Sequence, residues 1–563
     1  MGKKAAVLGV SSIFLVAMVV AAVVTVTRKN GEAAPDSAAG GNGGITTTTK
    51  AIKAICQPTD YKDTCEKSLG SAAGNTTDPK ELIKVAFQVA VKNIGDVMKN
   101  STVLQQAAKD PSISDALENC HELLDYSIAD LQRSFEKLGN FEISKLDAYL
   151  ADLKTWLSGA VTYQQTCLDG FENTTGDSGE KMKKLLKTAG ELTSNGLAMV
   201  SQFSTILQNL GIPGLGGVSR RLLSDVSSDG FPSWVSEGSR RLLQASPESV
   251  KPDVVVAKDG SGKYKTINEA LKDIPLKSNT TFVIYVKAGI YEENVEFSSQ
   301  MRNVILIGDG PTKTKITGNK SKVGGTATFK SATVAANGDG FVAKNIGFEN
   351  SAGSEMHQAV ALRVSSDMAV VYNCQIDGYQ DTLYAHVHRQ FYRDCIITGT
   401  IDFIFGDAIS VFQNCKMVVR KPLDNQSCMV TAQGRKEHFE TTGIVLQNCT
   451  ITAEPDVLTA SPPVKVYLGR PWKNFSRTII MNSQIDSVID PEGWAPWAGT
   501  AYLDTLYYAE YNNRGPGAVQ TKRVTWPGIK KITADEAAGY TAAKFLFGDN
   551  WIPKTGVPYN PGM

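Results

Sequence analysis

Two short stretches of this chain repeat each other and place an aspartate at the same point in each. Residues 378–384 (GYQDTLY) and 399–405 (GTIDFIF) share Gly, Asp, an aliphatic residue and an aromatic residue at an offset of 21 positions. If each period is one coil of a stacked β-structure, Asp381 and Asp402 lie on neighbouring strands about 4.8 Å apart. Two carboxylates held that close cannot both ionise easily, so one can act as an acid while the other stays anionic. The aromatic residues beside both positions favour this interpretation over a pair of turn or capping aspartates.

The same period continues on both sides of the aspartate pair. A polar residue, followed mostly by a small or sulfur-bearing residue and an aliphatic one, recurs at intervals of 28, 21, 20, 34 and 34 positions. These polar positions are Asn345, Asn373, Asp394, Asn414, Asn448 and Asn482. Short β-rich runs, such as residues 282–286 and 303–307, precede them. Short strands, irregular inserts and a basic repeat of about 20 residues predict a parallel β-helix rather than a sandwich. Such a fold presents equivalent positions of every coil on one long face, which suits a linear polymer as substrate.

Length and composition restrict the remaining possibilities. A chain of 563 residues exceeds one hydrophobic core, so two domains with extensions are expected. The net charge of +1 gives no reason to expect nucleic acid as a partner. The sequence has no zinc-type ligand spacing and no phosphate-binding glycine loop, so neither a metal nor an organic cofactor is expected.

The N-terminus has the character of a targeting segment. Residues 5–27 are uncharged and almost wholly apolar, with Lys3 and Lys4 before them and Arg28 and Lys29 after them. These 23 residues are long for a signal peptide and just long enough to span a bilayer. Residues 1–30 are therefore either a cleaved signal peptide or a signal-anchor, and both would send the remainder into the secretory lumen. Residues 31–49, rich in Gly, Ala and Thr, are interpreted as a flexible tether.

Residues 50–210 have the periodicity of helices. Asp78-Pro79 is a good helix start, and apolar residues then recur at helical spacing in four successive segments. Four amphipathic helices with short connections predict an antiparallel bundle, in which the fourth helix is either continuous or broken. Its cysteines, expected to form two disulfides in any of three pairings, are Cys56, Cys65, Cys120 and Cys167. No acid or histidine pair suggests chemistry, so the bundle is interpreted as a binding or regulatory domain.

A linker rich in Gly, Pro and Ser follows at residues 211–249. It contains the same dibasic string twice, as Arg220-Arg221-Leu222-Leu223 and as Arg240-Arg241-Leu242-Leu243. A dibasic pair alone is usually solvated charge. Because the string is duplicated within an exposed linker, we interpret it as a protease recognition site.

Several blocks of the second half resemble the signature segments of plant pectin methylesterases. They are residues 357–364 (HQAVALRV), 378–384, 402–406 (DFIFG) and 467–473 (YLGRPWK), and the resemblance extends from Val250 to the C-terminus. One departure is Ile401, where Val is more usual in that family.

The helical region, with residues 55–65 (ICQPTDYKDTC), resembles a pectin methylesterase inhibitor domain. The whole chain is similar to precursors in which such a pro-region precedes the enzyme. The resemblance implies an all-α four-helix-bundle pro-domain followed by a right-handed parallel β-helix catalytic domain at residues 250–563. In that group, Arg-Arg-Leu-Leu strings are sites for subtilisin-like processing proteases.

The resemblance also implies a role for each site residue. Asp402 would be the nucleophile that attacks a C6 methyl ester, and Asp381 would protonate methanol and later activate water. Gln358 and Gln380 would donate hydrogen bonds to the oxyanion, and Arg470 would keep Asp402 ionised. The residues expected to contact substrate are Thr326, Gln358, Tyr384, Phe405, Arg470 and Trp472.

The resemblance selects disulfide pairings that spacing alone leaves open. In the bundle it implies Cys56–Cys65 and Cys120–Cys167. In the β-helix, the cysteines at one repeat position are Cys374, Cys395, Cys415 and Cys449, and neighbouring coils bring them within disulfide range. The family's usual bridge makes Cys395–Cys415 the expected pair, which leaves an odd number of cysteines and at least one free thiol.

The expected function is therefore hydrolysis of methyl esters of homogalacturonan by an enzyme secreted to the plant cell wall. If residues 5–27 are a signal-anchor, they hold the precursor in a membrane. The expected partners are methyl-esterified pectin, a subtilisin-like protease and separate inhibitor proteins, and the enzyme is expected to be a monomer. Two alternatives are a β-helix glycoside hydrolase and a non-catalytic wall-binding protein. A polygalacturonase-like site should show clustered Asp-Asp and Gly-His-Gly motifs, which the sequence lacks.

Overall fold

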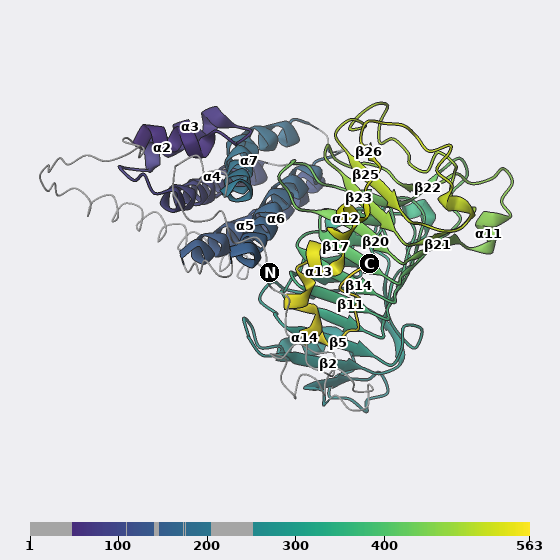
Figure 1. Ribbon diagram of the computed structural model, residues 1–563. Coiled ribbons are helices and arrows are strands. Elements are labelled where there is room, and N and C mark those ends of the chain that lie inside the picture. The colour runs from purple at the N-terminus through teal and green to yellow at the C-terminus, as the bar shows by residue number, and fades with distance from the viewer. Residues whose placement is uncertain (1–47, 108–109, 140–145, 173, 175, 204–250) are drawn as a thin grey trace, which may run out of the picture. The chain divides into compact units, whose positions relative to one another are not determined.

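The computed structural model describes residues 48–107, 110–139, 146–172, 174, 176–203 and 251–563 (Figure 1). The chain divides into two compact units, Met1–Leu223 and Ser224–Met563. None of the helices in the described ranges has both the length and the apolarity needed to cross a membrane. The predicted targeting segment and both dibasic strings lie outside the described residues.

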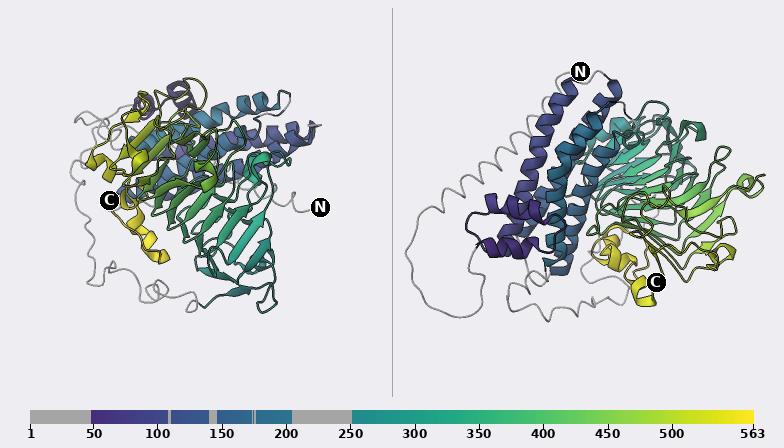
Figure 2. Two further views of the ribbon diagram at one scale, coloured as in Figure 1. Left: turned by 90° about the vertical axis from the view of Figure 1, so that its right-hand side faces the viewer. Right: turned by 90° about the horizontal axis from the view of Figure 1, so that it is seen from above.

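The first unit is an all-α bundle, as predicted. Its helices are α2 (Thr48–Cys56), α3 (Lys62–Ala72), α4 (Pro79–Ala107), α5 (Pro111–Gly139), α6 (Leu146–Asp169) and α7 (Ser178–Ser201). The four long helices form a closed ring of contacts in which α4 and α6 each touch both α5 and α7 (Figure 2). Helix α4 begins at the expected Asp-Pro step, where the Lys80 N–H donates to Asp78 Oδ1 at 2.8 Å. The fourth helix, α7, is continuous.

Two disulfides stabilise the bundle, and both expected pairings are present. Cys56–Cys65 joins the end of α2 to α3, with the Cα atoms 5.7 Å apart. Cys120–Cys167 joins α5 to α6, with the Cα atoms 4.5 Å apart. Helices α2 and α3 were not predicted, and α2 begins two residues inside the expected tether.

The second unit is a parallel β-helix made of three sheets, which confirms the predicted fold class (Figure 1). The eleven-stranded sheet contains β1 (Val254–Val256), β2 (Phe282–Val286), β5 (Val304–Gly308), β8 (Val342–Lys344), β11 (Ala369–Tyr372), β14 (Arg389–Arg393), β17 (Ile409–Gln413), β20 (Gly443–Gln447), β23 (Arg477–Met481), β25 (Tyr507–Tyr511) and β26 (Ile529–Lys530). The eight-stranded sheet contains β3 (Gly289–Glu292), β6 (Thr314–Gly318), β9 (Gly347–Asn350), β12 (Gln375–Asp377), β15 (Ile396–Gly399), β18 (Lys416–Val419), β21 (Thr450–Ala453) and β24 (Gln484–Ile485). The seven-stranded sheet contains β4 (Val295–Phe297), β7 (Val334–Ala336), β10 (Leu362–Val364), β13 (Leu383–Ala385), β16 (Ile404–Gly406), β19 (Cys428–Gln433) and β22 (Val466–Gly469).

Short helices accompany the coils. They are α10 (Ile267–Ala270), α11 (Pro455–Leu458), α12 (Ala534–Ala538), α13 (Ala542–Phe545) and α14 (Ile552–Thr555). The last three form an apolar cluster with side chains of the eleven-stranded sheet, so the C-terminal segment covers the outer face of that sheet (Figure 1).

The recurring polar residues of the sequence form one corner of each coil, between the eleven-stranded and the eight-stranded sheet. All six have left-handed backbone conformations, with φ between 49° and 57°. Asn and Asp tolerate this region better than most residues with a side chain. Successive side chains also pair: Asn373 Nδ2 donates to Asn345 Oδ1 at 2.7 Å, and Asn448 Nδ2 to Asn414 Oδ1 at 2.9 Å. The sequence period therefore marks the turns that set coil length.

The cysteine row has the expected register but not the expected bond. The strands that follow Cys374, Cys395, Cys415 and Cys449 pair in register, and the four side chains lie in the interior core. All of them, and Cys428, are free thiols, so the predicted Cys395–Cys415 disulfide is wrong. In-register side chains of parallel strands point the same way, so their Cβ atoms stay about 4.8 Å apart. A disulfide requires about 3.5–4.5 Å between these atoms.

Candidate active site

The two repeated aspartates occupy equivalent positions in neighbouring coils. Asp381 lies two residues before β13 and Asp402 two residues before β16, and these strands pair Leu383 with Ile404. Both aspartates have left-handed φ angles, 63° and 51°, and both are buried. The Asp381 N–H donates to the Ile401 carbonyl at 3.0 Å, so the turns that carry the two carboxyls are joined directly. The offset of 21 residues is thus one turn of the β-helix.

Arg470 binds the second aspartate through two parallel hydrogen bonds. It follows β22 directly, and its Nε and Nη2 donate to Asp402 Oδ1 and Oδ2 at 2.8 and 2.6 Å. The Arg470 N–H donates to Thr431 O at 3.0 Å, and the guanidinium lies 4.4 Å from the ring centre of Trp497. Because the guanidinium binds Asp402 through two hydrogen bonds and also packs against Trp497, it fixes the orientation of the carboxylate. Trp497 lies in a loop that carries no repeat, and sequence reasoning missed it.

The surroundings separate the acidities of the two carboxyls. Burial raises the pKa of Asp381 well above its usual range, and the neighbouring charge of Asp402 raises it further. Burial also raises the pKa of Asp402, but Arg470 opposes this shift through its charge and its hydrogen bonds. Asp402 is therefore the more acidic member of the pair. Asp381 can therefore keep its proton at a pH where Asp402 has lost its own.

Two glutamines lie in the turns next to the carboxyls. Gln380 precedes Asp381, and its carbonyl accepts from the Ala359 N–H at 3.2 Å, which places Gln358 in the preceding coil. Both side chains are half-buried. Neither side-chain amide has a hydrogen bond to any residue in the described part of the chain, so both N–H groups can donate to a ligand.

Aromatic rings line up beside the aspartates on the seven-stranded sheet. Tyr384 stacks on Phe405 with ring centres 4.2 Å apart and an interplanar angle of 17°. Phe405 in turn meets Trp472 edge-on at 5.9 Å. A Cβ at Gly434 would lie 2.7 Å from the Trp472 ring, so the glycine leaves room for the indole. Tyr384 and Phe405 are buried, whereas Trp472 is half-buried and is the more exposed ring of the three.

The loop that holds Thr326 is joined to Gln358, because the Lys322 N–H donates to the Gln358 carbonyl at 2.9 Å. Thr326 lies in the loop between β6 and β7, where its N–H donates to Ser321 O at 3.0 Å. Within the described residues, Thr326 has no hydrogen bond to either aspartate or to Arg470. No group of three or more His, Cys, Asp or Glu side chains in these residues is placed to hold a metal ion.

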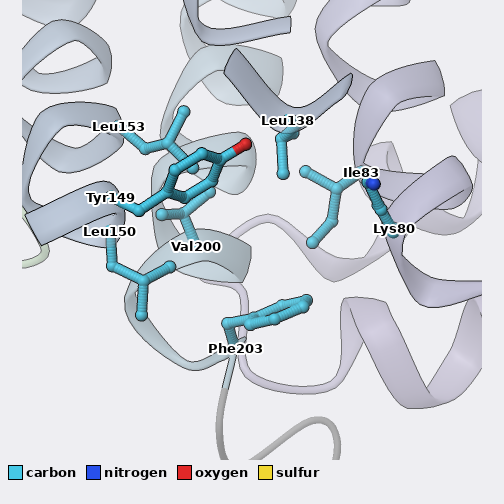
Figure 3. Close-up of a pocket in the computed structure, with 8 residues that line it drawn as sticks. All are labelled: Lys80, Ile83, Leu138, Tyr149, Leu150, Leu153, Val200 and Phe203. Atoms are coloured by element: carbon cyan, nitrogen blue, oxygen red, sulfur yellow. The ribbon is translucent and has the colours of Figure 1, made fainter. Parts of the chain in front are cut away.

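The helical unit has an apolar pocket of about 30 Å³ (Figure 3). Side chains from α4, α5, α6 and α7, and Phe203 just after α7, converge on it: Lys80, Ile83, Leu138, Tyr149, Leu150, Leu153, Val200 and Phe203. Such a volume admits only a few water-sized molecules. The lining includes no carboxylate or histidine, and its polar groups are those of Lys80 and Tyr149.

Comparison with known proteins gives the family of the chain. The pectinesterase family model matches residues 253–549, more than half of the sequence. The chain belongs to the pectinesterase family. The plant invertase/pectin methylesterase inhibitor family matches residues 50–199, so the helical unit is an inhibitor-type domain.

Similar proteins share either both units or the β-helix alone. A putative pectinesterase/pectinesterase inhibitor of Arabidopsis thaliana is 56% identical over 91% of this chain and 69% of its own. A pectinesterase of Petunia integrifolia is 56% identical over 68% of this chain and 99% of its own. The solved structure of a pectin methylesterase from carrot is 49% identical, with a TM-score of 0.56. It covers 57% of this chain and all of the carrot chain.

Proposed function

We propose that this pectinesterase hydrolyses C6 methyl esters of homogalacturonan, releasing methanol and leaving acidic pectin. The observation that carries the proposal is the bidentate Arg470–Asp402 pair beside a carboxyl, Asp381, of much lower acidity. An anionic nucleophile and a proton donor in adjacent coils are the two groups that a double-displacement ester hydrolysis requires.

In the first half-reaction, one Asp402 oxygen attacks the ester carbonyl carbon and forms a tetrahedral oxyanion. The Gln358 and Gln380 amides donate hydrogen bonds to this oxyanion. The carbon–oxygen bond to the methoxy group then breaks, and the departing oxygen takes the proton of Asp381. Methanol leaves, and an anhydride joins the Asp402 carboxyl to the sugar.

In the second half-reaction, Asp381 is an anion and removes a proton from water. The water oxygen attacks the galacturonosyl carbonyl carbon of the anhydride, and the bond to Asp402 breaks. Arg470 stabilises the Asp402 carboxylate as it leaves. The cycle ends with Asp381 protonated, Asp402 anionic and one ester converted to an acid.

Methanol release from methylated pectin by residues 251–563 tests this function. The wild-type domain should release methanol without forming new reducing ends. Asp402→Asn and Asp381→Ala should each lower kcat by at least about a thousandfold in a folded protein, because each removes a reacting group. Asp504→Asn, at an exposed carboxylate, is the matched control and should keep full activity. New reducing ends would favour the glycoside hydrolase alternative, and binding without any product would favour a wall-binding protein.

As part of the same proposal, the inhibitor-type unit restrains the enzyme until a subtilisin-like protease cuts after Leu223 or Leu243. Because both units belong to one chain, even a modest affinity gives high occupancy of the cleft. The released enzyme is a monomer secreted to the plant cell wall, where separate inhibitor proteins can also bind it.

The restraint is tested by replacing Arg220, Arg221, Arg240 and Arg241 together with Ala in the full chain. The variant should accumulate as uncut precursor with little methanol release. Normal secretion of a trimmed, active enzyme from this variant would rule out the strings as the cleavage site and their cleavage as the step that lifts the restraint.

A further inference from the structure

Arg420 reaches from one coil to the turn that carries Asp381, two coils away. It follows β18, and its Nη1 donates to the Gly378 carbonyl at 3.2 Å. The same guanidinium lies 4.4 Å from the ring centre of Tyr379. On its other side, Nε is 3.3 Å from Glu454 Oε1. The side chain is therefore held between an aromatic ring and a carboxylate.

The register explains how one side chain can span this distance. Strand pairing aligns Val419 with Gly399, and the Arg420 N–H donates to the Gly399 carbonyl at 2.8 Å. The Thr400 N–H in turn donates to the Tyr379 carbonyl at 2.9 Å, so Tyr379, Thr400 and Arg420 succeed one another along the stack. Thr400 is small and buried, and the long arginine side chain passes this coil to reach the next.

The turn that Arg420 touches holds both the proton donor and an oxyanion donor. Its backbone is also held by the bonds from the Ala359 N–H to Gln380 O at 3.2 Å and from the Thr400 N–H to Tyr379 O at 2.9 Å. Further hydrogen bonds join the Gly378 N–H to Thr398 O at 3.3 Å, the Asp381 N–H to Ile401 O at 3.0 Å, and Thr382 Oγ1 to Tyr379 O at 3.0 Å. Asp381 has a left-handed φ of 63°, which costs a residue with a side chain some conformational energy. Among the described residues, the Gly378 carbonyl accepts a side-chain hydrogen bond from another coil, and the donor is Arg420.

We propose that Arg420 is a positioning residue for ester hydrolysis: it holds the 378–381 turn so that Gln380 and Asp381 face Asp402. This inference rests on the proposed function. Reaction geometry is sensitive to displacements of about 1 Å, which can lower the rate by about a hundredfold. Arg420 acts by geometry rather than by charge, because the influences on the Asp381 pKa are burial, Asp402 and Arg470.

The test compares Arg420→Ala, Arg420→Lys and Glu454→Gln in residues 251–563. Arg420→Ala should lower kcat about tenfold, leave KM within about twofold and leave the pH profile of kcat unmoved. Arg420→Lys keeps a cation above Tyr379 and should recover part of the lost kcat. Glu454→Gln is the matched control, since it removes the ion pair but leaves both contacts with the turn. Its kcat should be close to that of the wild type.

Hydrogen exchange gives a second measurement that does not depend on catalysis. The Asp381 amide should exchange at least about tenfold faster in Arg420→Ala, because its bond to Ile401 opens more often. A folded Arg420→Ala with wild-type kcat and unchanged exchange would overturn the proposal, as would a loss confined to KM. If Arg420→Ala does not fold, Arg420→Gln takes its place with the same criteria. A wild-type domain that releases no methanol would instead refute the proposed function, and exchange would still decide the role of Arg420.

Discussion

Replacing Asp381, the proposed proton donor, should stabilise the protein, and the gain should grow with pH. Asp381 is 8% exposed, and burial followed by the Asp402 charge raises its pKa well above the ordinary value of 3.8. Above pH 3.8 the unfolded chain releases this proton while the folded protein still holds it. The stability that Asp381 contributes is therefore complete below the unfolded pKa and is lost as pH rises towards the folded pKa. Asn cannot ionise, so Asp381→Asn avoids this loss.

The size of the effect is given by how steeply the free energy of unfolding changes with pH. Where the folded state holds one more proton than the unfolded state, the free energy of unfolding falls by about 1.36 kcal/mol per pH unit. The difference between Asp381→Asn and wild type should rise at up to this rate above about pH 4 and level off past the folded pKa. Any change in local contacts that the amide introduces adds an offset that does not depend on pH, so the slope carries the test.

The assay is urea unfolding of residues 251–563 at pH 4, 5, 6 and 7, with wild type and variant measured side by side. Asp504→Asn, on an exposed loop, controls for the loss of one negative charge. A difference that stays flat or shrinks with rising pH would refute the assignment of Asp381 as the neutral acid. Asp381→Asn should at the same time be inactive, so the reaction requires a group that destabilises the fold.

Three further outcomes follow from the site and the core. Arg470→Lys should lower kcat/KM about a hundredfold and shift the acid limb of the kcat/KM–pH profile to higher pH. The shift is expected because a lysine opposes the burial-induced rise in the Asp402 pKa less strongly than Arg470 does. Methanol release measured across pH gives both quantities. Gly434→Ala should raise KM about fivefold with kcat nearly unchanged, since a Cβ 2.7 Å from the Trp472 ring must displace the indole; an unaltered KM would show that this ring does not contact substrate. All five thiols of the β-helix should be unreactive towards a thiol reagent in the folded protein and reactive after unfolding without reductant. Only three reactive thiols in the unfolded protein would restore the Cys395–Cys415 bridge.

The repeat made much of this site predictable. Asp381 and Asp402 share a position because the coil length is regular between them, and the corner asparagines record that length in the sequence. Each corner needs a residue that accepts a left-handed φ, so Asn or Asp recurs in the sequence once per coil. The four long helices of the bundle were predictable for the same kind of reason, since each buries a stripe of regular period.

What the sequence could not show depends on side-chain direction and on loops. A row of cysteines predicts adjacency, but a disulfide also depends on where the Cα–Cβ bonds point, and in-register strands hold those bonds parallel. Trp497 touches Arg470 from a segment without a repeat, and no spacing rule connects the two. Arg420 has the repeat position of Tyr379 and Thr400, but the spacing alone does not show that its side chain passes one coil to reach Tyr379. Helices α2 and α3 are short, and their burial depends on the bundle they pack against.

The site also shows how a stack of similar coils can give two equivalent residues different chemistry. Asp381 and Asp402 share backbone conformation and register, so the backbone alone would make them alike. Arg470 breaks the equivalence, because it follows β22, passes the coil of β19 and binds Asp402. Arg420 likewise passes one coil to reach the turn of Asp381. Long cationic side chains that run along the stack therefore contact both turns, and the one from Arg470 opposes the rise in the Asp402 pKa.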